Sequence, residues 1–421
     1  MIGSRRWFLK TVSVGGCAWL AGCGSTGSVG TKPGEPTRVE RIDEALSSAR
    51  QFLLGRQSDD GGWHSDVYGP FKEGPALTPL VMRTLATLPA SEDLERAFRK
   101  GADYLAAQIK ADGTVTVGPH GLDYPVYSAA GAVEVLSQPA NARHRKARDA
   151  WMAYLRERQL TEDLGWQPND KPYGGWGYAP RLPRKPKPGE PLPPLTESNL
   201  SATVFALEAL QAAGVKPDDP AFRKAVVFVR RCQNFSDDAK QREADFDDGG
   251  FYFIYDDAVR NKAGVAGKDR GGRERFVSYG STTADGWRAL TLCGRPADDP
   301  RVVAARSWSE TNFRADAHPG KYPADRRHNR DAVYYYYCSS VARALMAARL
   351  EELRTTDGMV RWAEALAGEL IKRQRKDGSW SNPLVPQRED DPLVATPLAG
   401  LALAKCRESL TGERVPLDGR P

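Results

Sequence analysis

The stretch Gln57-Ser-Asp-Asp-Gly-Gly-Trp63 joins two segments whose apolar residues recur at helical spacing. Residues 41–57 carry these side chains on one face, which predicts an amphipathic helix that packs on one side. Residues 77–88 are apolar on most sides, which predicts a helix buried nearly all round. This block therefore predicts an outer helix, a glycine-rich turn and an inner helix.

The block recurs along the chain, which predicts a repeat fold. Further copies of the turn begin at Gln108, Gln159, Gln233 and Gln374, and a degenerate copy lies at Asn312. One helix pair cannot bury its apolar face alone, so neighbouring pairs must stack. We expect an all-α (α/α)6 toroid, a closed ring of about six helix-pair repeats, over residues 41–410.

Three long inserts separate an outer helix from its inner partner, at about residues 161–198, 234–280 and 314–330. Successive helices alternate in direction, so these inserts should gather on the face where the inner helices begin. Long loops on one face of a rigid scaffold are a common place for a functional site.

The N-terminus carries two export motifs. Ser4-Arg-Arg-Trp-Phe-Leu-Lys10 matches the twin-arginine consensus, and Leu20-Ala-Gly-Cys23 matches the bacterial lipobox. We expect residues 1–22 to be a signal peptide, Cys23 to carry lipid, and residues 23–40 to form a flexible tether. The protein should be exported by the twin-arginine route and held by this lipid on the extracytoplasmic side of a membrane, in the periplasm. Residues 411–421 are predicted to be a C-terminal tail.

Composition excludes some classes of partner. The chain has 421 residues and a net charge of +6, without a basic stripe on any predicted helix, so no nucleic-acid partner is expected. Beyond the signal, no apolar run reaches the ~18 residues of a membrane span. The remaining cysteines are far apart and lie in apolar helical stretches, which favours buried free thiols over a zinc site. They are Cys232, Cys293, Cys338 and Cys406.

The Gln-x-x-Asp-Gly-x-Trp pattern resembles the QW repeat of squalene and other terpenoid cyclases and of protein prenyltransferase β subunits. The resemblance covers about residues 41–410 and implies the same (α/α)6 toroid. It says little about activity.

The zinc ligands of the prenyltransferases are incomplete in this chain. That family uses Asp-x-Cys before the fifth inner helix, where this chain has Asp331-Ala-Val333, and a histidine at the start of the last, where it has Ala395. Valine and alanine cannot coordinate zinc, so zinc-dependent prenyl transfer is not expected.

Three aspartates are candidate catalytic residues. The string Asp245-Phe-Asp247-Asp248 resembles the Asp-x-Asp-Asp motif of the class II cyclases, and this resemblance implies that Asp247, the middle acid, is a general acid. The alternative is a solvated acidic turn, because Asp248 already belongs to a repeat turn. Asp285 and Asp331 lie among apolar residues at inner-helix starts. Each could be an acid or base with a shifted pKa, or a helix-capping carboxylate.

Aromatic residues near the inner helices suggest a ligand cavity. About half of the run from Tyr334 to Tyr337 can face one way, and we expect Tyr334 and Tyr337, or Tyr335, to look into the ring. An aromatic cavity would suit an isoprenoid chain or a sugar ring, whereas the alternative is core packing. The candidate ligand-binding residues are Tyr127, Trp176, Tyr279, Trp287, Tyr334 and Tyr337.

The second insert also concentrates carboxylates. Asp245, Asp248, Asp256 and Asp257 could hold Mg²⁺ or Ca²⁺, or could balance the basic residues of the same insert.

Three functions remain open. The first is an exported terpenoid-cyclase-like protein that binds an apolar or isoprenoid ligand in a central cavity, with or without cyclase or transferase chemistry. The second is a non-catalytic envelope scaffold whose insert face binds a protein. The third is a carbohydrate-active toroid, because some polysaccharide lyases share this architecture.

Overall fold

The computed structural model describes residues 36–116, 122 and 124–413. The twin-arginine motif, Cys23 and most of the expected tether lie outside this range, as does most of the expected tail. The first helix begins at Arg38, inside the range expected to be tether.

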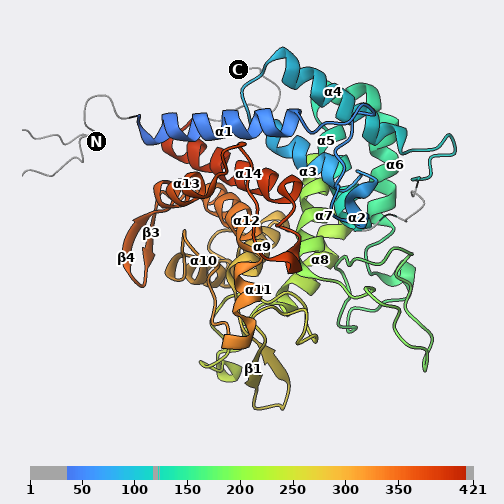
Figure 1. Ribbon diagram of the computed structural model, residues 1–421. Helices are drawn as coiled ribbons and strands as arrows, with labels where there is room; N and C mark the ends of the chain where they lie inside the picture. Colours follow the sequence, from blue (N-terminus) through green and yellow to red (C-terminus); the bar gives the residue numbers. More distant parts are fainter. Residues whose placement is uncertain (1–35, 117–121, 123, 414–421) are drawn as a thin grey trace, which may run out of the picture. The chain divides into compact units, whose positions relative to one another are not determined.

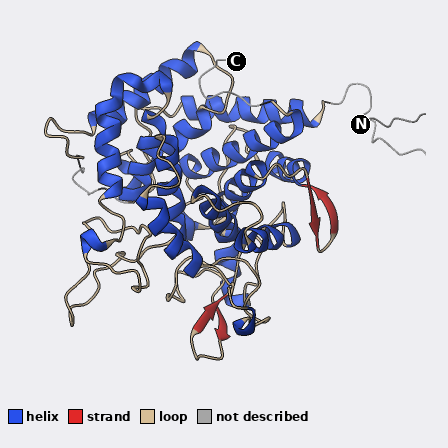
Figure 2. Ribbon diagram, turned by 180° about the vertical axis from the view of Figure 1, so that it is seen from behind, coloured by secondary structure: helices blue, strands red, loops and turns tan. Residues whose placement is uncertain are grey.

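Helices dominate the unit that begins at Arg38 (Figures 1 and 2). The outer helices are α1 (Arg38–Leu54), α4 (Glu92–Ala107), α6 (Arg145–Arg156), α8 (Pro220–Arg231), α10 (Pro300–Thr311) and α13 (Trp362–Arg373). The inner helices are α3 (Leu77–Leu85), α5 (Pro125–Leu136), α7 (Leu200–Ala212), α9 (Gly280–Leu292), α12 (Tyr334–Ala347) and α14 (Pro392–Thr411). The mostly helical, paired arrangement that the sequence predicts is therefore confirmed.

Shorter elements lie between these helices. They are the helices α2 (Gly69–Lys72) and α11 (Arg327–Asp331) and the strands β1 (Val265–Lys268), β2 (Glu274–Phe276), β3 (Glu352–Thr355) and β4 (Gly358–Arg361). The strands form two antiparallel hairpins, β1–β2 within the second insert and β3–β4 before α13.

The inner helices form a ring. In the described part of the chain, each contacts the next in the order α3, α5, α7, α9, α12 and α14, and α14 in turn contacts α3. The outer helix α1 packs against α13 and α14, so the two ends of the repeat array lie side by side (Figure 1).

Burial follows the amphipathic pattern. The outer helix α1 buries Ile42, Leu46 and Leu53 on one face, whereas the inner helix α9 is buried over almost its whole length. Among the described residues, Cys232, Cys338 and Cys406 are buried, Cys293 is partly buried, and all four are free thiols. No helix among the described residues is long and apolar enough to span a bilayer.

The glutamine of the repeated turn links neighbouring repeats. Nε2 of Gln159 donates to the carbonyl oxygen of Gly174 in its own turn, at 2.8 Å, and to that of Ala221 on α8, at 2.9 Å. Gln57, Gln233 and Gln374 donate in the same way to their own turns and to the next outer helix. Gln374 reaches Ala45 on α1, which closes the outer ring.

The tryptophan of the turn links an outer helix to its inner partner. Nε1 of Trp176 donates to the carbonyl of Leu155 on α6 at 2.9 Å, and its backbone N–H donates to Oγ1 of Thr203 on α7 at 3.1 Å. Trp63 and Trp380 repeat both bonds. The recurrence of Gln and Trp in the sequence thus has a direct physical cause.

Candidate functional site

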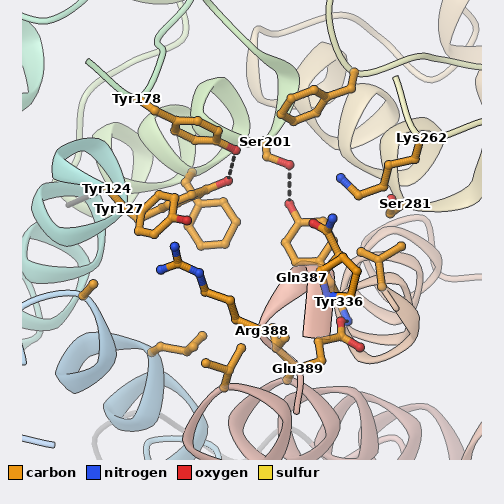
Figure 3. A pocket seen from close by; sticks show the side chains of 18 of the residues that line it. Tyr124, Tyr127, Tyr178, Ser201, Lys262, Ser281, Tyr336, Gln387, Arg388 and Glu389 are labelled. Carbon is orange, nitrogen blue, oxygen red and sulfur yellow. Dashed lines mark hydrogen bonds between the residues drawn. The ribbon is translucent and has the colours of Figure 1, made fainter. Parts of the chain in front are cut away.

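A central cavity of about 420 Å³ lies where the inner helices begin (Figure 3). This volume is in the range of small-molecule sites. In the described part of the chain, each of the inner helices contributes side chains to the wall. They include Leu77, Leu80 and Arg83 of α3, Tyr127 of α5, Ser201 and Phe205 of α7, Ser281 and Thr282 of α9, Tyr336 of α12, and Val394 and Leu398 of α14.

Loops complete the wall. The three inserts contribute Tyr178, Phe253, Val259, Arg260, Lys262, Tyr279 and Asn329. The segment 386–389, before α14, and Phe71 of α2 close another side. The expectation that the inserts gather on the face where the inner helices begin is confirmed, because all three border one cavity.

The wall is rich in aromatic rings. Its rings belong to Phe71, Tyr124, Tyr127, Tyr178, Phe205, Phe253, Tyr279 and Tyr336. The hydroxyls of Tyr127 and Tyr178 share a hydrogen bond of 2.8 Å, and the ring of Phe205 meets Tyr127 edge to face at 4.8 Å. Burial raises the pKa of both tyrosines well above the usual value, so both hydroxyls stay neutral. Such a wall suits an apolar chain.

A network of buried charges borders the cavity beside Arg83. Glu208 accepts from Arg83 at 3.3 Å and also from Arg288 and Arg343, and Arg83 pairs with Glu134 at 3.0 Å. Burial alone would raise the pKa of Glu208, but the three guanidinium groups outweigh it and lower the pKa.

Except for Asp285, the candidate residues chosen from the sequence do not belong to this network. A signal was present, since α3, α5, α7, α9 and α12 each carry one of these charges inside an apolar helix.

Asp285 connects this network to the cavity. Its carboxylate is fully buried, with Oδ1 2.9 Å from Nη1 of Arg288. Oδ2 accepts a hydrogen bond of 2.7 Å from the hydroxyl of Tyr336, which also lies 2.9 Å from the hydroxyl of Ser201. Burial raises the pKa of Asp285 more than Arg288 lowers it. Of the three predicted catalytic aspartates, Asp285 is connected to the cavity, through its hydrogen bond with Tyr336, which lines the wall.

Glu389 and Lys262 are titratable groups of the wall that the sequence analysis did not select. The Glu389 carboxylate accepts from the backbone N–H groups of Tyr335 and Tyr336 at 3.0 and 2.8 Å, at the start of α12. Burial raises the pKa of Glu389 to about 7, although the hydrogen bonds from these N–H groups lower it in part. Burial lowers the pKa of Lys262 to about 8, while Glu389 acts in the opposite direction.

Arg388 enters the cavity among aromatic rings. Its guanidinium carbon lies 5.2 Å from the ring centroid of Tyr124 and 5.3 Å from that of Phe71. Arg388 and Tyr124 both have left-handed backbone conformations, with φ of 61° and 57°. Such conformations are unfavourable for residues other than glycine and concentrate at functional sites.

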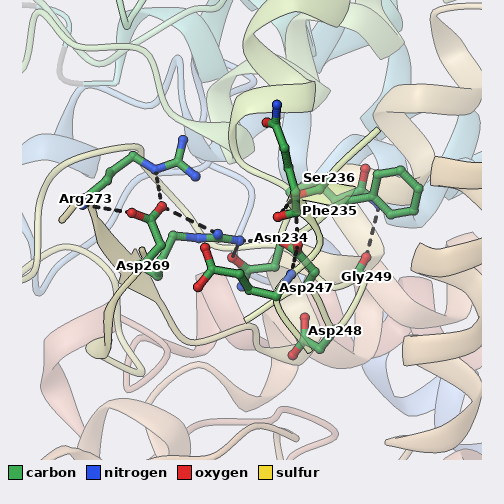
Figure 4. Close-up of polar contacts among 12 residues, drawn as sticks. Asn234, Phe235, Ser236, Asp247, Asp248, Gly249, Asp269 and Arg273 are labelled. Carbon is green, nitrogen blue, oxygen red and sulfur yellow. Dashed lines mark hydrogen bonds and ion pairs between the residues drawn. The ribbon is translucent and has the colours of Figure 1, made fainter. Parts of the chain in front are cut away.

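Asp247 lies away from the cavity wall, in a polar cluster of the second insert (Figure 4). Its Oδ1 pairs with Nη2 of Arg275 at 2.7 Å, and its Oδ2 accepts from Ser236 at 2.7 Å and from the backbone of Glu243 at 2.9 Å. Burial alone would raise the pKa of Asp247, but these hydrogen bonds lower it. Its carboxylate therefore stays ionised and holds the loop together.

Asp331 also lies outside the cavity wall. It ends α11, its side chain is about half exposed, and it pairs with the neighbouring Arg330.

Three of the four aspartates considered for Mg²⁺ or Ca²⁺ have separate protein partners. Asp248 accepts from Ser278 and Trp308, Asp256 pairs with Lys171, and Asp257 pairs with Arg260. Asp245 is exposed. Across the described ranges, no group of three or more His, Cys, Asp or Glu side chains is arranged to hold a metal ion.

The predicted aromatic residues divide between wall and core. Tyr127 and Tyr279 line the cavity, whereas Trp176 and Trp287 are buried in the helical core. Tyr334 and Tyr337 are turned outward. Their hydroxyls donate to the carbonyls of Ala315 at 2.6 Å and Arg314 at 2.9 Å in the third insert.

The residue of this tyrosine run that reaches the cavity is Tyr336. The phase of α12 decides this, and the sequence alone did not fix it.

Comparison with known proteins gives distant relationships. The chain is 28% identical over 222 residues to squalene–hopene cyclase from Bradyrhizobium diazoefficiens. The match covers 47% of this chain and 30% of that protein, so it spans less than a third of the relative's length. No family model matches the chain.

Solved structures share the fold over most of the chain. One is a type II terpene cyclase from Scytonema, solved with geranylgeranyl dihydroxybenzoate as substrate, with a TM-score of 0.54 and 14% identity; the match covers 89% of this chain and 98% of the cyclase. An unsaturated glucuronyl hydrolase specific for heparin has a TM-score of 0.51 and 13% identity, covering 89% and 99% of the two chains. The protein therefore has a terpene cyclase-like helical fold and is a distant homologue of squalene–hopene cyclase.

Proposed function

We propose that the protein is an (α/α)6 toroid of six helix-pair repeats that binds an isoprenoid-type apolar ligand in its central cavity. The observation that supports this proposal is the cavity itself, which is lined by aromatic side chains and by every inner helix of the described chain. An aromatic wall of this volume can cover most of an extended apolar molecule. The similar terpene cyclase was solved with a geranylgeranyl substrate, which fits the same ligand class.

We also propose that binding takes place outside the cytoplasm. The twin-arginine motif at Arg5 and Arg6 supports export, and Cys23 supports attachment to a membrane by lipid. Cys23→Ala should abolish lipid labelling. Replacing both arginines by lysine should leave the protein in the cytoplasm.

For the form of this proposal that includes cyclase or transferase chemistry, Asp285 is the acid–base group. It reaches the cavity through Tyr336, whereas Asp247 and Asp331 lie outside the cavity wall. Asp285→Asn should keep the ligand bound and stop its conversion, measured by chromatography of extracted lipids. Asp331→Asn is the matched control and should convert the ligand normally.

Native mass spectrometry of the protein purified from its own cells tests the binding itself. We expect a co-purified apolar lipid that is lost in Leu80→Trp, because the larger ring fills space beside the α3 wall. Leu80→Met keeps a similar volume and should retain the lipid. A wild-type protein that carries no lipid, and that binds no added isoprenoid, would contradict the proposal.

A further inference from the structure

Lys262 and Arg388 face the cavity and have no carboxylate of the described residues within ion-pair distance. Lys262 makes no ion pair or hydrogen bond through its ammonium group with the described residues, and Nζ lies 5.2 Å from the ring centroid of Phe253. Nη1 of Arg388 is buried and has no hydrogen-bond partner in the described part of the chain. Figure 3 shows both side chains pointing toward the middle of the cavity.

The other two cations of the wall are neutralised. Arg83 pairs with Glu134 and Glu208 of the buried network, at 3.0 and 3.3 Å. Arg260 pairs with Glu197 at 3.0 Å and with Asp257 at 2.6 Å. Nη1 of Arg260 also has no hydrogen-bond partner among the described residues, but the two carboxylates balance the charge of this side chain.

Glu389 does not neutralise Lys262. Its carboxylate is engaged by the first N–H groups of α12, and it lies beyond ion-pair distance of the ammonium group. Glu389 therefore compensates the start of a helix, where negative charge is favoured. The space in front of Lys262 and Arg388 keeps a positive potential.

A cation held against aromatic rings without a counter-ion costs free energy. An anionic group that enters the same space recovers part of this cost, because charge-assisted hydrogen bonds are strong where water is excluded. The inner helices also begin at this cavity, so their dipoles add to the positive potential.

We infer that the ligand of this cavity is an amphiphile, with an apolar chain against the aromatic rings and one anionic group, a carboxylate or a phosphate, near Lys262 and Arg388. This inference rests on the proposed function and specifies its ligand class. It adds a chemical requirement that apolar binding alone does not make.

Three probes that share one hydrocarbon chain and differ in the head group test the inference: geranylgeraniol, geranylgeranoic acid and geranylgeranyl phosphate. Binding to the full chain carrying Cys23→Ala is measured by calorimetry at pH 7. We expect the acid, the phosphate or both to bind about 10- to 100-fold more tightly than the alcohol. The comparison of acid with phosphate identifies which anionic group the cavity prefers.

The variants Lys262→Met and Arg388→Gln, alone and together, assign the effect. The double variant should bind all three probes with similar affinity while keeping the alcohol affinity of the parent chain. Each single variant should lose part of the preference. Lys268→Met and Arg327→Gln are controls, because both side chains are exposed.

Equal affinity of the parent chain for alcohol, acid and phosphate would overturn the inference and leave the proposed function standing. Failure of all three probes to bind would overturn both. If the double variant does not fold, as judged by circular dichroism, the three-probe comparison on the parent chain still decides.

Discussion

The hydroxyl of Tyr336 donates a hydrogen bond of 2.7 Å to Oδ2 of Asp285. One partner lines the cavity and the other is fully buried beside Arg288. This bond joins the ligand space to the charge network of the inner ring, so a change on the cavity wall affects the stability of the helices behind it.

Tyr336→Phe should lower the free energy of unfolding by about 1–3 kcal/mol, because it removes a donor from a buried carboxylate. Chemical denaturation measures the loss. Tyr335→Phe is the matched control, since the hydroxyl of Tyr335 makes no hydrogen bond with the described residues. Equal effects of the two variants would show that the bond contributes nothing.

Asp247→Asn should lower the free energy of unfolding by about 2–4 kcal/mol at pH 7, because it removes one charge of a buried pair with Arg275. The pKa of Asp247 is lowered in the folded protein, so its contribution is present above the unfolded pKa of about 4 and is lost as pH falls through the folded pKa. The variant should therefore lose less stability than the parent chain during acidification.

Asp245→Asn is the control for that experiment, as an exposed aspartate two residues away. It should change stability by less than about 0.5 kcal/mol. A loss of conversion activity in Asp247→Asn without a loss of stability would contradict the structural role.

Gln159→Ala should lower the free energy of unfolding by about 1–3 kcal/mol. The Gln159 side-chain amide donates to two carbonyls on different repeats, and both would lose a partner. Gln108→Ala should cost much less. The Gln108 amide makes one bond of 3.3 Å within its own helix turn. Thermal unfolding of the two variants measures the difference, and similar midpoints would argue against the inter-repeat link.

Binding of geranylgeranoic acid should weaken by about tenfold or more between pH 6 and pH 9. As pH rises, Glu389, with a pKa raised to about 7, gains negative charge, and Lys262, with a pKa lowered to about 8, loses positive charge. Both changes disfavour an anion. Burial lowers the pKa of His318 to about 3 and raises that of Tyr279, so both stay neutral over this range.

Geranylgeraniol is the control ligand for the pH series, because it carries no charge. Its affinity should stay within about twofold over the same range. A parallel loss of affinity for the alcohol would indicate a change in the cavity itself and would contradict the electrostatic explanation.

The ring could be predicted because its information is local. A Gln, a Gly and a Trp make the same hydrogen bonds in the turns that begin at Gln57, Gln159 and Gln374, although the Gln159 turn carries a long insert. Each copy can therefore be recognised without knowledge of its neighbours. The pairing of outer and inner helices follows from amphipathicity in the same way.

The residues that line the cavity were harder to predict, because they depend on the phase of the helices and on loops that are distant in sequence but close in space. Tyr336, rather than Tyr334 or Tyr337, faces inward because of the phase of α12, which places the hydroxyls of the other two against the third insert. Arg388 and Glu389 reach the site from a loop that no motif marks. The charge network was detectable, since a lone charge inside an apolar helix requires a buried partner.

The contact between Gln374 and Ala45 joins residues that are 329 positions apart. During synthesis the first repeats emerge long before the last ones. The apolar faces of α1 and α3 therefore stay exposed until α13 and α14 have been synthesised and pack against them. Contacts between distant parts of a chain also make folding slow. Because Val394 and Leu398 of α14 form part of the wall, the ligand space comes into existence only when the last helix docks, and a bound ligand would favour that final step.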